Sequence, residues 1–307
     1  MNFLIYEDFL HFIPTGKSWA SGLFRNNQVV YNSGPRDGKL LEILEKVDTK
    51  IECVVFSDIS LDKEYWIELD KIKQRFPDIK LIGMVCDYQT EYNLYQPYFN
   101  FVTSIAFQHK SAEHIFKSSG YKYYNIPLAA DDNIFKPLNT TQDNDISFVG
   151  QFGNTGHGYR RQDEYLFPLL DDKNLKASTG GFEYKNCANR YIQHESLNIL
   201  FNDTKINLNF HYDHQKDFED RIDLNGRTFE ICAAGGFQLC DHPLAKQLIP
   251  SMIVEPDGKK WKDIVYYYLE HEDERKEIAR KCREEVLSGH TWRLRMARLL
   301  HILENKD

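Results

Sequence analysis

The sequence lacks a long hydrophobic run. Its most apolar stretches, residues 80–86 and 51–56, are far shorter than the roughly 18 residues that a membrane-spanning helix needs. The N-terminus, MNFLIYEDFL, has no basic segment before its apolar residues, and it carries Glu7 and Asp8 where a signal peptide stays uncharged. We therefore expect no membrane span, and we interpret the N-terminus as the first buried strand of a cytoplasmic protein.

Paired cysteine motifs and an excess of positive charge are also missing. None of the six cysteines forms a C-x-x-C pair, and most stand in apolar runs, so we expect buried free thiols. The 46 acidic side chains outnumber the 38 basic ones, for a net charge of −8. This balance argues against a partner bound mainly through a phosphate backbone, although a local basic groove stays open. We find no internal repeat.

The chain has enough apolar material for two cores, because 42% of its 307 residues are hydrophobic. Short apolar runs alternate with amphipathic segments, which is typical of strand–helix–strand units and a mostly parallel sheet. Helical spacing of apolar residues predicts a helix over 63–76. In the first half the expected strands are Asn2–Tyr6, Gln28–Tyr31, Cys53–Ser57, Lys80–Cys86, Val102–Ala106 and Tyr123–Ile126.

The polar stretch 137–145, PLNTTQDND, has the composition of an interdomain linker. We therefore expect an N-terminal domain over 1–140 and a C-terminal domain over 141–307. The C-terminus is predicted to form one helix over 264–287 and another after Gly289. The expected strands of the second domain are Ile146–Gly150, Ile206–Phe210, Phe237–Cys240 and Met252–Val254.

In open parallel sheets, ligands bind beyond the carboxyl ends of the strands, so the turns that leave Tyr6, Val149 and Phe210 are the first candidates for a site. The turn after Val149, GQFGNTGHGYRR, contains Gly150 and ends in Arg160 and Arg161. Glycines let backbone amides approach an oxyanion, and guanidinium groups add positive charge for a diphosphate. A flexible glycine loop with surface arginines explains the same pattern equally well.

The first loop contains the letters TGKS, which imitate the end of a phosphate loop. His11 stands where that motif requires its earlier glycine, so we reject a nucleoside triphosphatase. We retain Gly16 and Lys17 as residues that line a cleft on the acceptor side.

The segment 225–241, NGRTFEICAAGGFQLCD, predicts a short helix that is ended by Gly235 and Gly236 and leads into a buried strand. Glu230 lies in the N-terminal half of this helix, where a carboxylate can accept hydrogen bonds from a ribose diol. Arg227, one turn earlier, could reach a phosphate or a departing oxygen. The alternative is an exposed ion pair between these two side chains.

From Asp145 to its end the chain resembles the C-terminal domain of the spore-maturation-type (CgeB-like) glycosyltransferases, which belong to the glycosyl transferase group 1 with the GT-B fold. The matching segments occur in the family's order over about half the chain, and the first half is compatible but less specific. They are DISFVGQF at 145–152, the arginines at 160–161, TKINLNFH at 204–211, RTFEICAAGGFQLCD at 227–241 and HTWRLR at 290–295.

This resemblance implies an α/β protein of GT-B architecture. Two Rossmann-like domains with mostly parallel sheets would face each other across a cleft, with a C-terminal helix packing back and the C-terminal domain binding a nucleotide-sugar donor. Glu230 would hold the donor ribose, Arg227 and the glycine turn with Gly150 would hold the diphosphate, and Gly235–Gly236 would let the backbone approach the donor. Ile222 stands where related retaining enzymes have an acidic residue, so the stereochemical course is open.

Three further residues, Asp87, His109 and His211, join the arginines as candidates for the chemistry. Preorganised cations such as Arg227, Arg160 and Arg161 can stabilise the departing diphosphate without a metal. A general base would come from the N-terminal half, with Asp87 and His109 as candidates. His211, in the segment HYDH, is a candidate contact of the donor sugar. HYDH has metal-binding residue types but lacks a further spaced set of partners, so we expect neither a metal nor a cofactor.

The sequence thus predicts a cytoplasmic hexosyl- or pentosyltransferase that moves a sugar from a nucleotide diphosphate sugar to a hydroxyl acceptor on a glycan, a protein or a small molecule. A phage-type transferase that acts on a hydroxymethylated pyrimidine of DNA is an alternative. It would need a basic groove, lined by Lys17, Arg25, Lys110 and Lys122. A non-catalytic nucleotide-sugar-binding module is another. A nucleotide-sugar epimerase shares the fold but fits the quoted segments less well. The sequence leaves the oligomeric state open.

Overall fold

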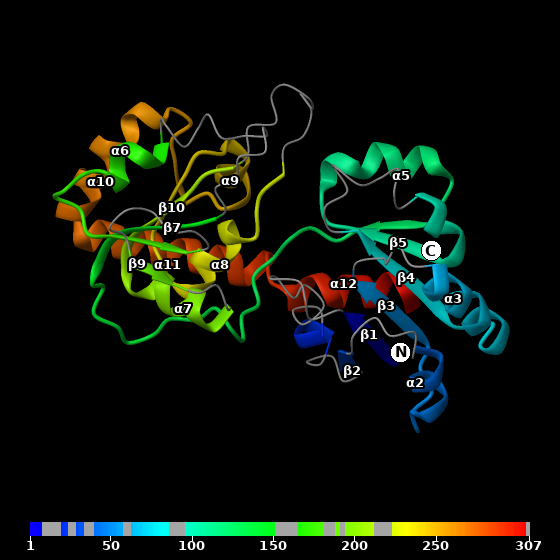
Figure 1. Ribbon diagram of the computed structural model, residues 1–307. Coiled ribbons are helices and arrows are strands. Elements are labelled where there is room, and N and C mark those ends of the chain that lie inside the picture. Colours follow the sequence, from blue (N-terminus) through cyan, green and yellow to red (C-terminus); the bar gives the residue numbers. More distant parts are fainter. Residues whose placement is uncertain are drawn as a thin grey trace. The chain divides into compact units, whose positions relative to one another are not determined.

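The computed structural model of the chain (Figure 1) consists of two α/β units. Unit 1 combines Met1–Pro127 with Trp292–Asp307, and unit 2 is Leu128–Thr291. This division differs from the expected domains 1–140 and 141–307 at both ends of unit 2. The residues that the structure describes are 1–7, 20–23, 29–33, 40–57, 63–85, 96–150, 165–180, 188–190, 194–211 and 223–304.

Unit 1 is built on a six-stranded parallel sheet with the order β2-β1-β3-β4-β5-β6. Every strand lies within two residues of a predicted one. The strands are β1 (Phe3–Glu7), β2 (Val29–Ser33), β3 (Cys53–Ser57), β4 (Lys80–Val85), β5 (Ser104–Phe107) and β6 (Tyr123–Asn125). The helices are α2 (Leu40–Lys46), α3 (Lys63–Arg75), η1 (Gln96–Phe101), η2 (Lys110–Ala112), α5 (Glu113–Ser119) and α12 (Trp292–Glu304).

Both faces of this sheet are buried, because successive side chains of a strand point to opposite faces. Leu4, Val54 and Ile105 share a core with residues of α2, α3 and α5, while their neighbours Ile5 and Val55 are buried on the other face. The C-terminal helix α12 returns to this unit. The Nζ of Lys80, at the start of β4, donates to the carbonyl of Leu303 in α12 at 2.7 Å, and Figure 1 shows this helix in red beside β3 and β4.

Unit 2 has a second six-stranded parallel sheet, with the order β12-β11-β10-β7-β8-β9. The strands are β7 (Asn144–Val149), β8 (Ala177–Gly180), β9 (Ala188–Arg190), β10 (Thr204–Asn209), β11 (Gln238–Cys240) and β12 (Ile253–Val254). The helices are α6 (Phe167–Leu170), α7 (His194–Asn202), α8 (Arg227–Ala234), α9 (Pro243–Leu248), η4 (Gly258–Lys260), α10 (Trp261–Glu270) and α11 (Glu272–Gly289).

The two faces of this sheet differ in polarity. Ile146, Ile206 and Leu208 pack with α6 and α10 in an apolar core. The alternate residues of the same strands, such as Asn207 and Asn209, are buried on the side of α7, α8 and α11, where they form hydrogen bonds. This face also has an apolar core, which includes Val149, Leu200 and Ile231, so the polar residues are buried in addition to it. Because burying polar groups costs free energy, they indicate a purpose beyond packing.

The polar stretch that we interpreted as a linker is part of unit 2. The amide of Leu138 donates to the side chain of Asn202 at 2.7 Å, and that of Lys136 donates to Asn198 at 3.0 Å. Because α7 supplies these amide side chains, the stretch 136–140 is tied to unit 2 although it carries few apolar residues. Composition alone reports such a segment as a linker.

Two other expectations need correction. The helix predicted over 264–287 is broken at His271, whose backbone (φ −109°, ψ 64°) leaves the helical region between α10 and α11. The first turn of α11 contains Glu272, Asp273 and Glu274, which favour a new helix N-terminus. Strands β8 and β9 were not predicted. The sequence of β8, ASTG, has no β-branched aliphatic or aromatic residue, and its place between β7 and β9 makes it a strand.

Candidate functional site

The strand order of unit 2 reverses between β7 and β10. In chain order its strands read 3-2-1-4-5-6, the arrangement of dinucleotide-binding folds, and ligands bind beyond the carboxyl ends of the two strands where such a sheet reverses. Gly150 follows β7 at this edge, and His211 follows β10 two residues after Asn209. The turns that leave Val149 and Phe210 were predicted as site turns, and the topology places both at this reversal.

Helix α8 begins at the same edge. The side chain of Asn209, the last residue of β10, donates to the hydroxyl of Thr228 at 3.0 Å. Arg227 and Glu230 stand on either side of Thr228 in the first turn of the helix, and both are partly buried. The prediction of a short helix that is ended by Gly235 is confirmed, and its first turn lies at the carboxyl edge of the sheet.

The carboxyl of Glu230 is held in an environment that disfavours its charge. Burial raises the pKa of Glu230 to about 7; the Arg227 guanidinium acts in the opposite direction, and the Asp131 carboxylate raises the pKa further. Asp131 is itself 2% exposed. A carboxyl with this pKa exists in both protonation states near neutrality, so it can donate as well as accept a hydrogen bond.

The backbone amides at the start of α8 are already engaged. The amide of Thr228 donates to the carbonyl and side-chain oxygens of Asn225, and those of Phe229 and Glu230 donate to the carbonyl of Gly226. A helix N-terminus normally offers such amides to an anion. Here an anion at this edge would depend on side chains, of which Arg227 is the cationic one in the turn.

Gly235 and Gly236 lie at the other end of α8. Gly235 has φ +83° and ends the helix, and a Cβ on Gly236 would come within 2.8 Å of the Asn207 side-chain nitrogen. The strand that follows, β11, begins at Gln238, so both glycines stand at the amino edge of the sheet. The structure does not bring them together with Glu230 and Arg227, and it gives them a structural role in the turn from α8 to β11.

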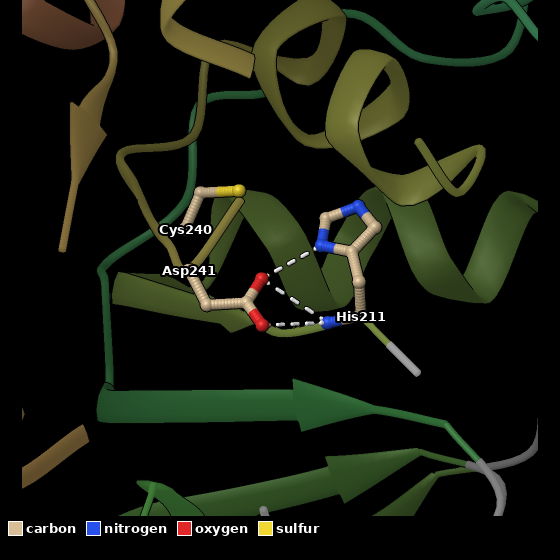
Figure 2. A group of neighbouring side chains, drawn as sticks. All are labelled: His211, Cys240 and Asp241. Atoms are coloured by element: carbon tan, nitrogen blue, oxygen red, sulfur yellow. Dashed lines mark hydrogen bonds and ion pairs between the residues drawn. The ribbon is translucent and has the colours of Figure 1, made fainter. Parts of the chain in front are cut away.

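A histidine–aspartate pair occupies the carboxyl edge beside β10 and β11. The Nδ1 of His211 is 2.7 Å from Asp241 Oδ1, and the backbone amide of His211 donates to both carboxylate oxygens at 3.1 Å. The dashed lines in Figure 2 follow these three contacts. His211 is 6% exposed and Asp241 1% exposed. The buried carboxylate thus holds the imidazole ring as well as the backbone that carries it.

The side chains of His211, Cys240 and Asp241 are also the three types that bind transition metals, and one potential ligand atom of each lies within 4.8 Å of the others (Figure 2). Two ligand atoms of a tetrahedral zinc site lie about 3.3 Å apart. The 2.7 Å between Nδ1 and Oδ1 is too short for that, and it fits a hydrogen bond. This geometry favours a hydrogen-bonded pair over a metal centre.

The network continues from His211 into α8. His211 Nε2 is 3.3 Å from the hydroxyl of Thr228, Asn225 donates to Asn209 at 2.9 Å, and Asn209 donates to Gln238 at 2.6 Å. The sequence analysis missed Asp241, Thr228 and the amide side chains. The alternation in INLNF, residues 206–210, could have indicated them, because polar residues at every second position of a two-sided sheet must be buried.

In unit 1 the sheet order reverses between β1 and β3. His109 lies near the carboxyl edge of this sheet, two residues after β5, where it precedes η2. Its neighbour Gln108 is 6% exposed, and no residue in the described part of the chain provides a hydrogen-bond partner for its Nε2. Gly16, Lys17, Asp87, Arg160 and Arg161 lie outside the described residues.

Four of the predicted free thiols can be checked. Cys53, Cys232, Cys240 and Cys282 are all buried free thiols, which confirms the expectation for them. None of the helices in the described ranges combines the length and the apolarity that crossing a membrane requires.

The comparisons with known proteins agree with this architecture. Residues 133–301, more than half of the chain, match the model of the family described as glycosyl transferase-like. The structure of HepE from Anabaena, solved in complex with UDP and glucose, is similar with a TM-score of 0.64 and 9% identity, over 99% of each chain. No curated protein matches the chain in sequence.

A second similar structure is the Glycosylation Associate Protein (Gap123) complex from Streptococcus agalactiae. Its TM-score is 0.51 at 10% identity, and the match covers 87% of this chain and 57% of that one. At these identities the similarities concern the fold, in which two Rossmann-like units follow each other. The family match begins at Asn133 and ends at His301 in α12, so it includes His211, Arg227 and Glu230. The chain belongs to the glycosyl transferase-like family and has the GT-B fold.

Proposed function

We propose that this glycosyltransferase binds a nucleotide diphosphate sugar at the carboxyl edge of the unit 2 sheet and transfers the sugar to a hydroxyl acceptor. The observation that carries the proposal is the first turn of α8, where the partly buried carboxyl of Glu230 stands beside Arg227 at the point where the strand order reverses. Both residues fall inside the region that matches the family.

Uridine diphosphate is the nucleotide to test first. HepE, which has the same fold, was solved with UDP-glucose as well as with UDP and glucose. We extend this donor class to the present chain and, within it, to hexosyl or pentosyl donors. We also propose that the chain belongs to the CgeB-like subtype, which residues 145–295 resemble.

Glu230 would bind the ribose of the donor. A carboxylate can accept hydrogen bonds from both hydroxyls of a diol, and a neutral carboxyl can accept one and donate one. The pKa near 7 makes both forms available at physiological pH. Arg227 would pair with the diphosphate, assisted by Gly150, Arg160 and Arg161 from the turn after β7.

The chemical requirement is stabilisation of negative charge on the departing diphosphate while the sugar becomes cationic. Fixed guanidinium groups can meet this requirement because they already point at the charge that develops. We therefore propose that transfer proceeds without a metal.

Unit 1 would bind the acceptor. Asp87 and His109 remain the candidates for the general base, and Gly16 and Lys17 for the acceptor side. The buried free thiols agree with a cytoplasmic location.

The test is UDP affinity, measured by calorimetry on the wild type and on Glu230→Ala. We expect UDP and UDP-glucose to raise the melting temperature of the wild type, and the substitution to weaken UDP binding at least tenfold, because the ribose loses its carboxyl. Glu284→Ala, on the exposed face of α11, is the control and should bind UDP normally. An unchanged UDP affinity in folded Glu230→Ala would contradict the assigned role.

Turnover separates the enzyme from a binding module. Release of UDP from UDP-glucose in the presence of an acceptor panel supports transfer, whereas tight UDP binding with no released nucleotide identifies a module that only binds. EDTA should leave the rate unchanged. A rate that falls with EDTA and returns with a divalent cation would overturn metal independence.

A further inference from the structure

The first turn of α8 is held in place by side chains of the sheet beneath it. Asn209 in β10, Gln238 in β11 and Asp241 after β11 are 0%, 3% and 1% exposed, and each forms hydrogen bonds within the unit. Burying such groups costs free energy that their hydrogen bonds recover only in part. Other residues of α8, among them Phe229, Ile231 and Ala234, pack in an apolar core on this face of the sheet, whereas the first turn meets these polar side chains.

These side chains form a continuous path that ends on one residue of α8. The carboxylate of Asp241 holds the His211 ring through Nδ1, and the other ring nitrogen, Nε2, contacts the Thr228 hydroxyl at 3.3 Å. Asn209 reaches the same hydroxyl at 3.0 Å. Thr228 is completely buried, so these contacts take place away from solvent.

The path also fixes the turn that precedes α8. The side-chain amide of Asn225 donates to the side-chain oxygen of Asn209 at 2.9 Å. The side-chain oxygen of Asn225 accepts a hydrogen bond from the backbone N–H of Thr228 at 3.2 Å. The backbone on both sides of Arg227 is therefore attached to β10. Because Glu230 follows two residues after Thr228, the same attachment sets the direction in which its carboxyl leaves the helix.

We propose that Asp241, His211 and Thr228 are positioning residues of the donor site, which act through the Thr228 hydroxyl to hold Arg227 and Glu230 in the orientation that binds the diphosphate and the ribose. This inference rests on the proposed function. It assigns roles to Asp241 and Thr228, and it changes the role of His211 from a sugar contact to a support of the helix. The 6% exposure of His211 agrees with a residue that acts through another one.

The arrangement determines the tautomer of the ring. A carboxylate only accepts hydrogen bonds, so Asp241 requires the proton on Nδ1. In a neutral ring Nε2 is then an acceptor. The Thr228 hydroxyl accepts a hydrogen bond from the side-chain amide of Asn209, and its single proton has two acceptors at 3.3 Å, His211 Nε2 and the side-chain oxygen of Asn225. The ring and the hydroxyl thus complement each other without an additional group.

The chain offers a closely matched pair of substitutions for the test. Thr204, at the amino end of β10, is also completely buried, and its hydroxyl donates to the Leu200 carbonyl at 2.8 Å. Thr228→Val and Thr204→Val each replace one buried hydroxyl by a methyl group of the same size. They act at opposite edges of the same sheet, so they separate a loss of stability from a loss of orientation.

We expect both variants to lose melting temperature, and Thr228→Val alone to bind UDP about tenfold more weakly and to raise the KM for UDP-glucose by a similar factor. Thr228→Ser should restore the affinity because it returns the hydroxyl. In the wild type, ¹⁵N spectra should show His211 protonated at Nδ1, and Asp241→Asn should weaken UDP binding and change this signal.

The outcomes distinguish the two proposals. If wild-type UDP affinity is normal and Thr228→Val binds as tightly as Thr204→Val, the positioning role is wrong while the proposed function stands. If Thr228→Ser binds as weakly as Thr228→Val, the methyl packing and not the hydroxyl matters, and the inference is overturned. If the wild type binds neither UDP nor UDP-glucose, the proposed function fails and this inference with it.

Discussion

At the scale of single residues, Glu230 is the carboxyl whose surroundings matter most for function. Its pKa is raised to about 7 mainly because burial shields the carboxyl from much of the surrounding water, while Arg227 opposes the shift and Asp131 adds to it. Raised carboxyl pKa values are concentrated at functional sites, because a folded protein keeps such a group only where something offsets its cost. In this chain the offset would be donor binding.

The raised pKa predicts how stability depends on pH. In the unfolded chain Glu230 loses its proton near pH 4.5, but in the folded chain it keeps the proton until about pH 7. The folded state therefore binds more protons between these values, and its stability falls as pH rises from about 5 to 7. Glu230→Gln removes this contribution, so the variant should gain stability relative to the wild type at pH 8 and show little difference at pH 4.

Urea unfolding of both proteins across this range is the measurement. Glu277→Gln is the control of opposite sign, since the Arg280 guanidinium lowers the pKa of the exposed Glu277 to about 2. The small, solvent-screened contribution of this pair to stability is fully present above about pH 4.5 and is lost as the pH falls to about 2. If the difference in unfolding free energy between the wild type and Glu230→Gln is the same at every pH, Glu230 titrates normally in the folded state.

At the scale of elements, α8 links the two edges of the unit 2 sheet. Its first turn carries the candidate binding residues, and its last residue is followed by Gly235 in the left-handed region. The signals of this helix were readable, because a glycine after an amphipathic run ends a helix. Three consecutive acidic residues also indicated the break between α10 and α11. The apolar periodicity continues across this break, and for that reason we predicted a single helix.

Gly235→Ala should destabilise unit 2 by about 1–2 kcal/mol or more, because an L-residue pays this cost at positive φ. The new Cβ would in addition lie 3.2 Å from the Pro137 ring. Gly120→Ala is the matched comparison, since Gly120 ends α5 at φ +77° with open space around its Cβ position. Urea unfolding should show the larger loss of unfolding free energy for Gly235→Ala. Equal losses in the two variants would show that the contact with Pro137 adds nothing to the cost.

At the scale of the whole chain, the last helix belongs to the first unit. α12 contributes Trp292, Met296 and Leu299 to unit 1 among its buried residues, and Lys80 of β4 bonds to its last turn. The sequence correctly indicates an apolar stripe on this helix. A stripe does not say which surface it covers, and neighbours in the chain favour unit 2, which ends at Thr291.

Removal of 292–307 should therefore damage unit 1 and spare unit 2. Burial of each large apolar side chain of α12 contributes about 1.5–3 kcal/mol, so losing the helix removes an amount comparable to the 5–15 kcal/mol by which domains are stable. We expect the truncated chain to lose the unfolding transition of unit 1 and to retain that of unit 2 together with UDP binding. Removal of 305–307 alone is the control, and a truncated chain with both transitions intact would contradict the assignment.

The sequence by itself determined the type of most elements, the presence of two parallel sheets and the segment that carries Glu230 and Arg227. These follow from periodicity and from residues that are close in the chain, because such patterns act within a few turns of helix or a few residues of strand. The tertiary structure alone decided that Asp241, His211 and Thr228 meet, since 30 and 17 positions separate them in the chain. It also decided the raised pKa of Glu230, the distance of Gly235 and Gly236 from the site and the unit that α12 joins, because burial and register exist only after the sheets have formed.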